Sequence, residues 1–308
     1  MEQQFDLEYA GLRKGSLDGK VAVVTGGARN IGRGFARGIA WAGAKVVVTD
    51  ILEDDGHETA RLINSECGTD AAIYVKCDLT KQEDVKNMAK AAFDKYGKVD
   101  ILVNNAMNMS LNGSVLTSST SDLEQSFAIS AMGVMYSIQE FVPGMIERGY
   151  GVVTYSTTQF HYAPPLVGGA IYTAGKAAAT SLIMSLANEV KDTGVSVFCM
   201  APTGIFTPKK DAAPPPLRSS GERSKVLTGF DGPIPAIAGG AAMVYNILNA
   251  KKLHGSGIIL FDAFDAMDYP YPSPETRRPS GQFKRLTDME LTMVLCNMGQ
   301  GYGEIDAK

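Results

Sequence analysis

Residues 21–32 read VAVVTGGARNIG and join an apolar strand, a cluster of glycines and the start of a helix. The run 21–24 is apolar at every position, which is typical of a strand buried on both faces. Beyond the glycines, Ile31, Phe35 and Ile39 recur with helical spacing. Glycines let the backbone approach an anion closely, and the N–H groups at a helix N-terminus attract negative charge. The stretch therefore predicts either a phosphate-binding turn or simply a tight strand–helix turn.

The rest of the chain repeats this alternation of strand and helix. Further strands are expected at 45–49, 72–76, 100–103, 151–155, 195–200 and 257–261, and helices at 54–65, 81–96, 122–148, 170–191 and 236–250. Strict alternation favours a parallel sheet covered by helices on both faces. We therefore predict an α/β protein with a three-layer α/β/α, doubly wound, seven-stranded and mostly parallel sheet, forming a single domain over residues 19–264. Residues 1–18 and 265–308 are expected as N-terminal and C-terminal extensions, and the proline-rich segment 207–233 as a loop.

Composition narrows the class of protein. Of the 308 residues 45% are hydrophobic and 20% are charged, which is enough apolar side chain for a sizeable core and argues against disorder. The net charge of −4 gives no reason to expect nucleic acid or a membrane as a partner. Four scattered cysteines, three distant histidines and no basic leader in residues 1–10 predict a cytoplasmic protein without disulfides, a metal site or a secretory signal.

Asp50 ends the second expected strand, about 20 residues beyond the glycine cluster. In a dinucleotide-binding βαβ unit, a carboxylate at this place accepts hydrogen bonds from the hydroxyls of the adenosine ribose. The same carboxylate would repel the 2′-phosphate of NADP, so Asp50 favours NAD. Arg29, in the glycine turn, favours the opposite choice, because a guanidinium pairs well with a phosphate. We give more weight to Asp50, which lies where the ribose 2′-oxygen must be, and expect NAD in preference to NADP.

Five motifs in order along the chain carry a resemblance to a known family. They are LDGKVAVVTGG at 17–27, CDLT at 77–80, NNA at 104–106, YTAGK at 172–176 and PTGIFT at 202–207. Through them, residues 17–262 resemble the short-chain dehydrogenase/reductase family, whose members have a Rossmann fold. The resemblance implies an NAD(P)-dependent oxidoreductase whose cofactor contacts are Gly26, Arg29, Asn30, Ile31, Gly32, Asp50, Ile51, Asp78, Leu79, Asn105, Ala106, Tyr172, Lys176, Pro202, Thr203 and Ile205.

The YTAGK motif places Tyr172 and Lys176 four residues apart on an expected helix, and therefore on one face. An ammonium beside the phenol favours the phenolate and lowers the pKa of the tyrosine, so that Tyr172 can exchange a proton with an alcohol or a ketone. The resemblance implies that Lys176 also holds the nicotinamide ribose. It further implies a substrate-orienting hydroxyl at the end of the fifth strand, which we assign to Thr157 with Ser156 as the competing candidate. The family's relay asparagine is replaced here by Ser130.

The chain departs from the family pattern at three glycine positions, which Asn30, Met107 and Thr203 occupy. Asn30 is compatible with the turn, because asparagine tolerates left-handed dihedral angles. The substrate pocket is expected beyond the carboxyl ends of the strands, at Met107, Met109, Gln159, Phe160, His161, Tyr162, Ile205 and Phe206. This lining predicts a medium-sized, largely apolar substrate, although both methionines are equally compatible with the core. Segment 207–233 lies where the family keeps a mobile lid.

Three functions are compatible with these motifs. The first is an oxidoreductase that interconverts a secondary alcohol and a ketone, which the intact Tyr172–Lys176 pair favours. The second is an epimerase, dehydratase or lyase that uses tightly bound NAD for a transient oxidation. The third is a non-catalytic, NAD-binding regulatory protein, which the replacements Ser130, Met107 and Thr203 would permit. Family members assemble through two long helices, here about 120–148 and 170–191, so we expect a homodimer or homotetramer.

Overall fold

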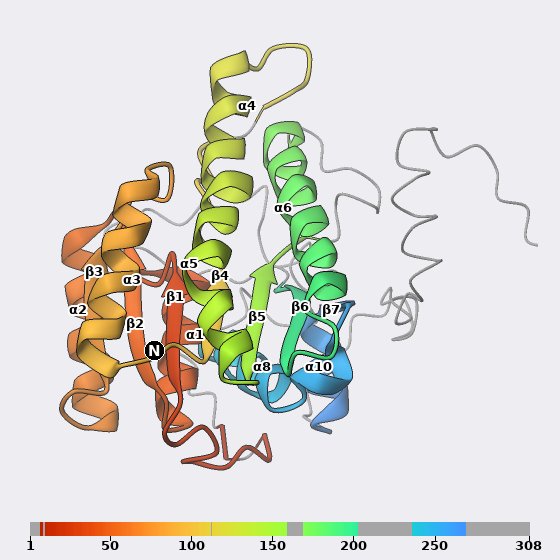
Figure 1. The fold of residues 1–308 in the computed structure, drawn as a ribbon. Coiled ribbons are helices and arrows are strands. Elements are labelled where there is room, and N and C mark those ends of the chain that lie inside the picture. The colour runs from red at the N-terminus through yellow and green to blue at the C-terminus, as the bar shows by residue number, and fades with distance from the viewer. Residues whose placement is uncertain (1–6, 9, 112, 159–168, 203–235, 269–308) are drawn as a thin grey trace, which may run out of the picture.

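The computed structural model describes residues 7–8, 10–111, 113–158, 169–202 and 236–268. Within these ranges, seven parallel strands form one sheet in the order β3-β2-β1-β4-β5-β6-β7 (Figure 1). The strands are β1 Val21–Thr25, β2 Lys45–Asp50, β3 Ala72–Lys76, β4 Ile101–Asn104, β5 Gly151–Ser156, β6 Val195–Ala201 and β7 Ser256–Ile259. The chain runs outward from β1 in one direction and then returns to β4 on the other side. This is the doubly wound topology expected from the sequence.

Helices cover both faces of the sheet (Figure 1). The first face carries α1 Asn30–Trp41, α2 Glu53–Cys67, α8 Ala236–Leu248, α9 Ala250–Leu253 and α10 Leu260–Ala266. The second carries α3 Gln82–Tyr96, α5 Gly133–Glu147 and α6 Ala170–Glu189, with α4 Thr120–Phe127 packed on α6. Neighbouring strand residues face opposite cores, Val24 the first and Val23 the second. Burial on both sides explains why the strands are apolar nearly throughout.

The last strand is shorter than its apolar run predicts. β7 ends at Ile259, and Leu260 and Phe261 begin helix α10 instead of continuing the strand. The Asp262 carboxylate accepts a hydrogen bond from the Ile259 N–H at 2.9 Å and thereby caps the new helix. A short apolar run is compatible with a strand or a buried helix, and here the capping carboxylate favours the helix.

The long helix expected at 122–148 is interrupted. Between α4 and α5 the chain makes a π-helical turn, η1 Ala128–Met132, so the helix contains one extra residue there. Ser130 lies within this turn and is fully buried. π-turns of this kind occur often at functional sites, and this one lies against α6.

The described residues before β1 pack on the domain. Leu7, Leu12 and Leu17 are buried in the same core as α1 and α8. The Leu17 N–H donates a hydrogen bond to the Ala42 oxygen at 2.6 Å. This part of the N-terminal extension therefore adds to the core on the α1 face of the sheet.

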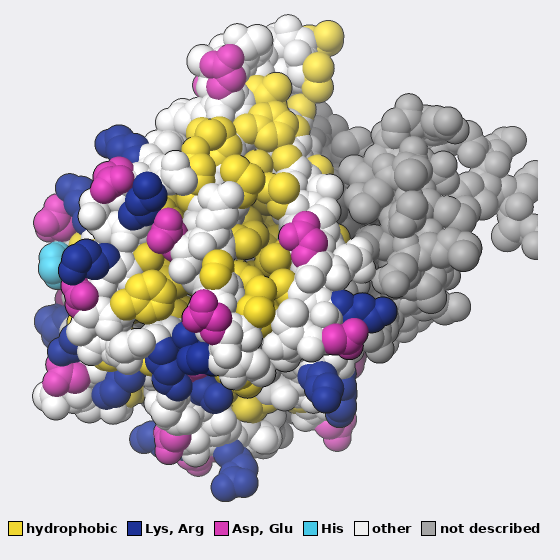
Figure 2. Space-filling model, viewed as in Figure 1, with side chains coloured by type: hydrophobic (Ala, Val, Ile, Leu, Met, Phe, Trp, Pro, Cys, Tyr) yellow, Lys and Arg dark blue, Asp and Glu magenta, His cyan; other side chains and the backbone are white. Residues whose placement is uncertain are grey.

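Hydrophobic side chains gather on the surface over α4 and α5, beside α6 (Figure 2). Met132 is 44% exposed and Met135 is 38% exposed, although both lie in the middle of this helical stretch. We expect subunits to assemble through this stretch, and an exposed apolar surface is compatible with that prediction.

The carboxyl ends of the strands meet at one edge of the sheet. β1 and β4 are neighbours there, with Val24 opposite Val103, although the chain visits β2 and β3 between them. In open α/β sheets, ligands bind at this point of reversal. The glycine turn after β1 and the polar residues after β2, β4 and β5 all lie at this edge.

Candidate active site

The turn after β1 is built without room for side chains. Gly26 has a φ of +66° and Asn30 has a φ of +50°, both in the left-handed region. A Cβ on Gly26 would lie 2.7 Å from the Ala106 Cα, and a Cβ on Gly32 would lie 1.9 Å from the Gly26 oxygen. Asn30 adopts the left-handed conformation for which asparagine is suited. The backbone is therefore open to the close approach of a phosphate at the start of α1.

Arg29 and Ile31 flank the first residue of α1. Arg29 is the N-cap residue, but its side chain makes no capping hydrogen bond to the first turn and is exposed. Ile31 is half-buried and packs against the core of the α1 face. The first-turn N–H groups are thus not capped by Arg29, and such groups are the ones that bind anions at helix N-termini.

Main-chain N–H groups hold the Asp50 carboxylate at the end of β2. One oxygen accepts a hydrogen bond from the Ala28 N–H at 3.2 Å, and the other accepts one from the Leu52 N–H at 3.1 Å. Asp50 is half-buried, and the adjacent Ile51 is 60% exposed. A carboxylate oxygen can accept more than one hydrogen bond. Asp50 can therefore also accept hydrogen bonds from ribose hydroxyls, which is the role expected for it.

Asp78 and Leu79 follow β3 but lie in different surroundings. The Asp78 carboxylate accepts hydrogen bonds from the Thr80 N–H at 3.1 Å and the Thr80 hydroxyl at 2.7 Å, and lies 3.4 Å from the Lys81 ammonium. Burial alone would raise the pKa of Asp78, but these contacts outweigh it and leave the pKa below its usual value. The Leu79 side chain is buried in the core, so a ligand contact by Leu79 would have to use its main chain.

A cavity of about 460 Å³ adjoins Asp78 at the same edge. It is lined by Ile51, Lys76, Asp78, Lys81, Asp84 and Asn87. The cavity thus brings together Ile51 and Asp78, two residues predicted from the sequence to contact the cofactor. Its lining carries two lysines and two carboxylates, so their charges balance, and Lys81 pairs with Asp78.

Asn105 ties the end of β4 to the glycine turn. The N–H groups of Asn105 and Ala106 donate to the Thr25 hydroxyl at 2.9 and 3.2 Å. The Asn105 side-chain amide donates to the Thr25 and Gly26 carbonyl oxygens at 3.1 and 3.2 Å. These bonds fix the ends of β1 and β4 relative to each other, and the structure brings together Gly26, Asn105 and Ala106, three residues expected to contact the cofactor.

Tyr172 and Lys176 lie one turn apart near the start of α6. Lys176 is only 3% exposed, and its ammonium donates a hydrogen bond to the Ser156 carbonyl oxygen. The ammonium lies 4.7 Å from the centre of the Tyr155 ring and 5.9 Å from the centre of the Tyr172 ring. Burial lowers the pKa of Lys176 to about 7. The two side chains therefore share one face of the helix and lie beside the end of β5.

Three hydroxyls at the end of β5 lie in different surroundings. Burial raises the pKa of Tyr172, and a hydrogen bond between the Tyr172 and Thr158 hydroxyls partly offsets this rise. The Thr157 hydroxyl lies 2.6 Å from the Thr180 hydroxyl of α6, and the Ser156 hydroxyl is buried without a partner in the described part of the chain. The structure therefore brings Thr158 to Tyr172, whereas the sequence assignment named Thr157.

No pattern in the sequence separated Thr158 from Thr157. Both residues follow Ser156, the last residue of β5, so the alternation of side chains along the strand does not decide between them. Thr157 contacts Thr180, which lies about two helical turns beyond Tyr172 on α6.

Ser130 is buried in the π-turn against α6. Its hydroxyl donates a hydrogen bond to the Ser126 carbonyl oxygen, and the Ser126 hydroxyl donates to the Ile171 oxygen of α6 at 3.1 Å. A Cβ on Gly175 would lie 2.3 Å from the Ser126 hydroxyl and 2.7 Å from the Ser130 hydroxyl. Because these residues are small, α6 can approach the π-turn closely at Gly175, the residue directly before Lys176. A relay role for Ser130 stays a prediction.

Several predicted residues lie outside the described part of the chain. They are Thr203, Ile205, Gln159, Phe160, His161, Tyr162, Phe206 and the segment 207–233. Pro202, directly after β6, is half-buried, as is Met107, whereas Met109 is 57% exposed. The expected substrate lining and lid stay predictions.

The described site fits a dinucleotide cofactor. The cradle of the glycine turn is too narrow for a side chain but open to a phosphate, and the Asp50 carboxylate lies beside it. Within the described ranges, no group of three or more His, Cys, Asp or Glu side chains is placed to hold a metal ion. No helix of that part is long and apolar enough to span a membrane.

The sequence and the structure both match known proteins. A family model described as short chain dehydrogenase matches residues 20–216. Short chain aldehyde dehydrogenase 1 of Euphorbia lathyris is 33% identical, and the match covers 62% of this chain and 66% of that protein, about two thirds of its length.

Two solved structures have similar folds. One is a metagenomic short-chain oxidoreductase in complex with NADP, with a TM-score of 0.57 and 30% identity over 61% of this chain and 84% of that chain. The other is a 7α-hydroxysteroid dehydrogenase complexed with NADH and 7-oxo glycochenodeoxycholic acid, with a TM-score of 0.70 and 26% identity over 83% of this chain and 96% of that chain.

Proposed function

The chain belongs to the short-chain dehydrogenase family of oxidoreductases, and we propose that it is an NAD-dependent enzyme that interconverts a secondary alcohol and a ketone. One observation carries this proposal. Tyr172 and the buried Lys176 lie one helical turn apart on one face of α6, with the Lys176 ammonium 5.9 Å from the centre of the Tyr172 ring and bonded to the Ser156 oxygen at the end of β5.

Each of these side chains has a role in the proposed reaction. Tyr172 donates a proton to a ketone oxygen or accepts one from an alcohol. Thr158 donates a hydrogen bond to the same oxygen and orients it, a role that we assign to Thr158 in place of Thr157 because of its contact with Tyr172. Lys176, when protonated, stabilises the phenolate form of Tyr172 through its positive charge. A nicotinamide cofactor, when bound, supplies or accepts the hydride.

We propose NAD as the cofactor, with NADP as the weaker ligand. The adenosine ribose would lie at Asp50, and the pyrophosphate at the turn from Gly26 to Gly32. Both Asp50 oxygens accept main-chain hydrogen bonds, which holds the negative charge at the ribose position. This charge would repel the 2′-phosphate of NADP, whereas the exposed Arg29 side chain would attract that phosphate. The two similar solved structures contain NADP in one case and NADH in the other.

For the substrate, we propose a medium-sized and largely apolar secondary alcohol or its ketone. Met107 directly follows Ala106 and is half-buried, whereas Met109 is 57% exposed. The hydroxysteroid dehydrogenase that resembles this chain was solved with 7-oxo glycochenodeoxycholic acid. The half-buried Met107 and this ligand support the proposal.

We also propose that the chain forms a homodimer or homotetramer through the hydrophobic surface over α4 and α5. The exposed Met132 and Met135 support this assembly. Light scattering after size exclusion would measure the number of subunits, and Met135→Glu should reduce it. A monomeric wild-type protein would contradict the proposal. A cytoplasmic location stays a proposal, supported by free thiols at the described Cys67, Cys77 and Cys199.

Oxidation of a panel of secondary alcohols and reduction of the matching ketones, with NAD(H) and with NADP(H), would test the activity. Tyr172→Phe should abolish turnover and leave NAD binding nearly unchanged, because only the proton-transferring hydroxyl is lost. Tyr96→Phe is the matched control, since its hydroxyl bonds to the Asp70 oxygen on the surface near the end of α3. Wild-type activity in Tyr172→Phe would refute the assignment.

The same experiment separates the alternative functions. Cofactor that copurifies with the protein, together with no net formation of NADH, would favour an epimerase, dehydratase or lyase. NAD binding without turnover of any alcohol or ketone in the panel would favour a regulatory protein.

A further inference from the structure

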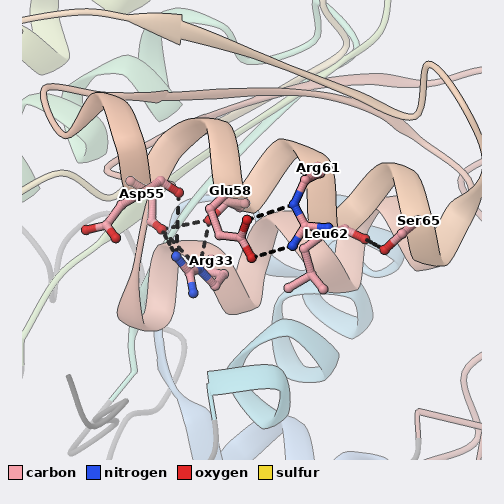
Figure 3. Close-up of polar contacts among 8 residues, drawn as sticks. Arg33, Asp55, Glu58, Arg61, Leu62 and Ser65 are labelled. Carbon is pink, nitrogen blue, oxygen red and sulfur yellow. Dashed lines mark hydrogen bonds and ion pairs between the residues drawn. The ribbon is translucent and has the colours of Figure 1, made fainter. Parts of the chain in front are cut away.

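Arg33 reaches from α1 to the carbonyl oxygen of a residue in the glycine turn. Its Nε and Nη2 atoms donate hydrogen bonds to the Ala28 oxygen at 3.0 and 2.8 Å. Nε also donates to the Thr59 hydroxyl of α2 at 2.7 Å, and Nη2 lies 3.5 Å from the Asp55 main-chain oxygen. Figure 3 shows the Arg33 guanidinium lying beside α2 and joined to Asp55. One guanidinium thus connects α1, α2 and the turn.

Both main-chain polar groups of Ala28 are hydrogen-bonded. Its oxygen accepts a further hydrogen bond from the Thr59 hydroxyl at 2.7 Å, in addition to the bonds from Arg33. Its N–H donates to the Asp50 carboxylate at 3.2 Å. Ala28 itself is fully buried. The orientation of Ala28 therefore determines both the path of the turn and one of the two hydrogen bonds that hold Asp50.

The turn needs such support because it contains a conformation of low intrinsic stability. Asn30, two residues after Ala28, has a φ of +50°, and non-glycine residues in this region persist only where the surroundings hold them. A binding loop that is held in its bound conformation loses less entropy when the ligand arrives. Arg33 makes the support rigid, because a planar guanidinium donates several bonds in fixed directions.

We propose that Arg33 is a positioning residue that sets the affinity of the site for the adenosine half of the dinucleotide. It acts through Ala28, whose N–H orients the Asp50 carboxylate toward the ribose. This inference rests on the proposed function, because it requires that the site binds a dinucleotide.

Arg37 provides a matched control on the same helix. It lies one turn after Arg33 and also connects α1 to α2, through a paired contact with Glu66 at 2.6 and 3.0 Å. Its partner Glu66 lies near the C-terminal end of α2, away from the glycine turn. Loss of Arg37 therefore removes a link between the two helices without removing a hydrogen bond of Ala28.

The test is direct binding of ADP-ribose, which carries the adenosine and pyrophosphate but no nicotinamide, measured by calorimetry together with the melting temperature. Arg33→Met should raise the Kd for ADP-ribose by about tenfold or more, as expected for the loss of several hydrogen bonds from a charged donor. Thr59→Val should raise it by a smaller factor. Arg37→Met should lower the melting temperature but leave the Kd within about twofold.

Arg33→Lys separates geometry from charge, because lysine keeps the charge without the fixed fork of donors. Its Kd should lie between those of the wild type and Arg33→Met at both low and high salt. If Arg33→Lys binds as the wild type does, and the defect of Arg33→Met disappears at 0.5 M salt (where the screening length is roughly twofold shorter than at about 0.1 M), simple attraction of phosphate replaces the proposed role. Should Arg33→Met prove unstable, the variants Arg33→Lys and Thr59→Val allow the same comparison with Arg37→Met.

The outcomes distinguish the two proposals. If wild-type protein binds neither ADP-ribose nor NAD, the proposed function fails and this inference fails with it. If the wild type binds and the Arg33 and Thr59 variants bind equally well, only the role of Arg33 is overturned. An equal loss of affinity in Arg37→Met would also overturn it, because any weakening of the α1–α2 contact would then be sufficient.

Discussion

The neighbouring hydroxyls Thr157 and Thr158 should respond differently to the same substitution. Valine has nearly the shape of threonine, so each change removes a hydroxyl and little else. Thr158→Val removes the group that is hydrogen-bonded to Tyr172, and loss of one donor to a reacting oxygen typically lowers kcat by about 100-fold or more. Thr157→Val removes the 2.6 Å contact with Thr180, which costs about 1 kcal/mol of unfolding free energy.

The smaller cost of Thr157→Val follows from the remaining contacts of Thr180. The Thr180 hydroxyl still donates to the Lys176 carbonyl oxygen at 2.8 Å, so no buried hydroxyl loses its last partner. For a domain of this size, that cost corresponds to a fall in melting temperature of about 2 °C. We therefore expect Thr157→Val to keep a kcat within about threefold of the wild type, because its hydroxyl contacts Thr180, about two helical turns beyond Tyr172 on α6.

The assay combines steady-state kinetics with thermal melting for both variants and for Thr158→Ser. Serine restores a hydroxyl, so Thr158→Ser should recover most of the activity lost in Thr158→Val. A 100-fold loss of kcat in Thr157→Val, with full activity in Thr158→Val, would refute the reasoning and return the role to Thr157. Full activity in both variants would leave Ser156 as the orienting hydroxyl.

Three further predictions follow from the same edge of the sheet. Burial lowers the pKa of Lys176 from 10.5 to about 7, so the unfolded chain binds more protons between these values and the free energy of unfolding should rise with pH across this window. Lys176→Met should flatten that rise between pH 7 and 9 in urea titrations. Gly32→Ala should destabilise the fold by about 1–3 kcal/mol and weaken NAD binding, since its Cβ would lie 1.9 Å from the Gly26 oxygen, whereas Gly144→Ala meets only the Arg148 side chain at 3.1 Å and should be tolerated. Asp50→Asn should shift the ratio of NAD to NADP dissociation constants toward NADP by about tenfold, and an unchanged ratio would mean that Asp50 does not select the cofactor.

The positions of the buried strands could be predicted because their chemistry is local. β1 is apolar from Val21 to Val24 and β2 from Val46 to Val48, and a parallel sheet covered on both faces needs such unbroken apolar runs. The end of β7 could not be predicted in the same way. The run Gly257–Phe261 is compatible with either element, and the change to a helix at Leu260 depends on the Asp262 carboxylate at the helix start.

The site was predictable where it depended on motif spacing and not where it depended on tertiary contacts. Tyr172 and Lys176 share a face because four residues make about one helical turn. Arg33 carried no such signal, because its partners come from the glycine turn and from α2 and meet only in the folded chain. The π-turn at Ser130 was also hidden, since a helix with one extra residue has nearly the same apolar pattern as a regular one.

The two halves of the site are joined through the neighbouring strands at the point of reversal. The glycine turn and Asp50 belong to the β1–β2 side, whereas the Tyr172 hydroxyl and the Lys176 ammonium lie beside β5. β4 lies between β1 and β5, and Asn105 at its end is bonded to both Thr25 and Gly26. Because Asn105 contacts the turn directly, a change in the turn would be transmitted to β4, the strand that pairs with β5. The spacing between the proposed adenosine and catalytic ends therefore depends on Asn105 as well as on the residues at either end.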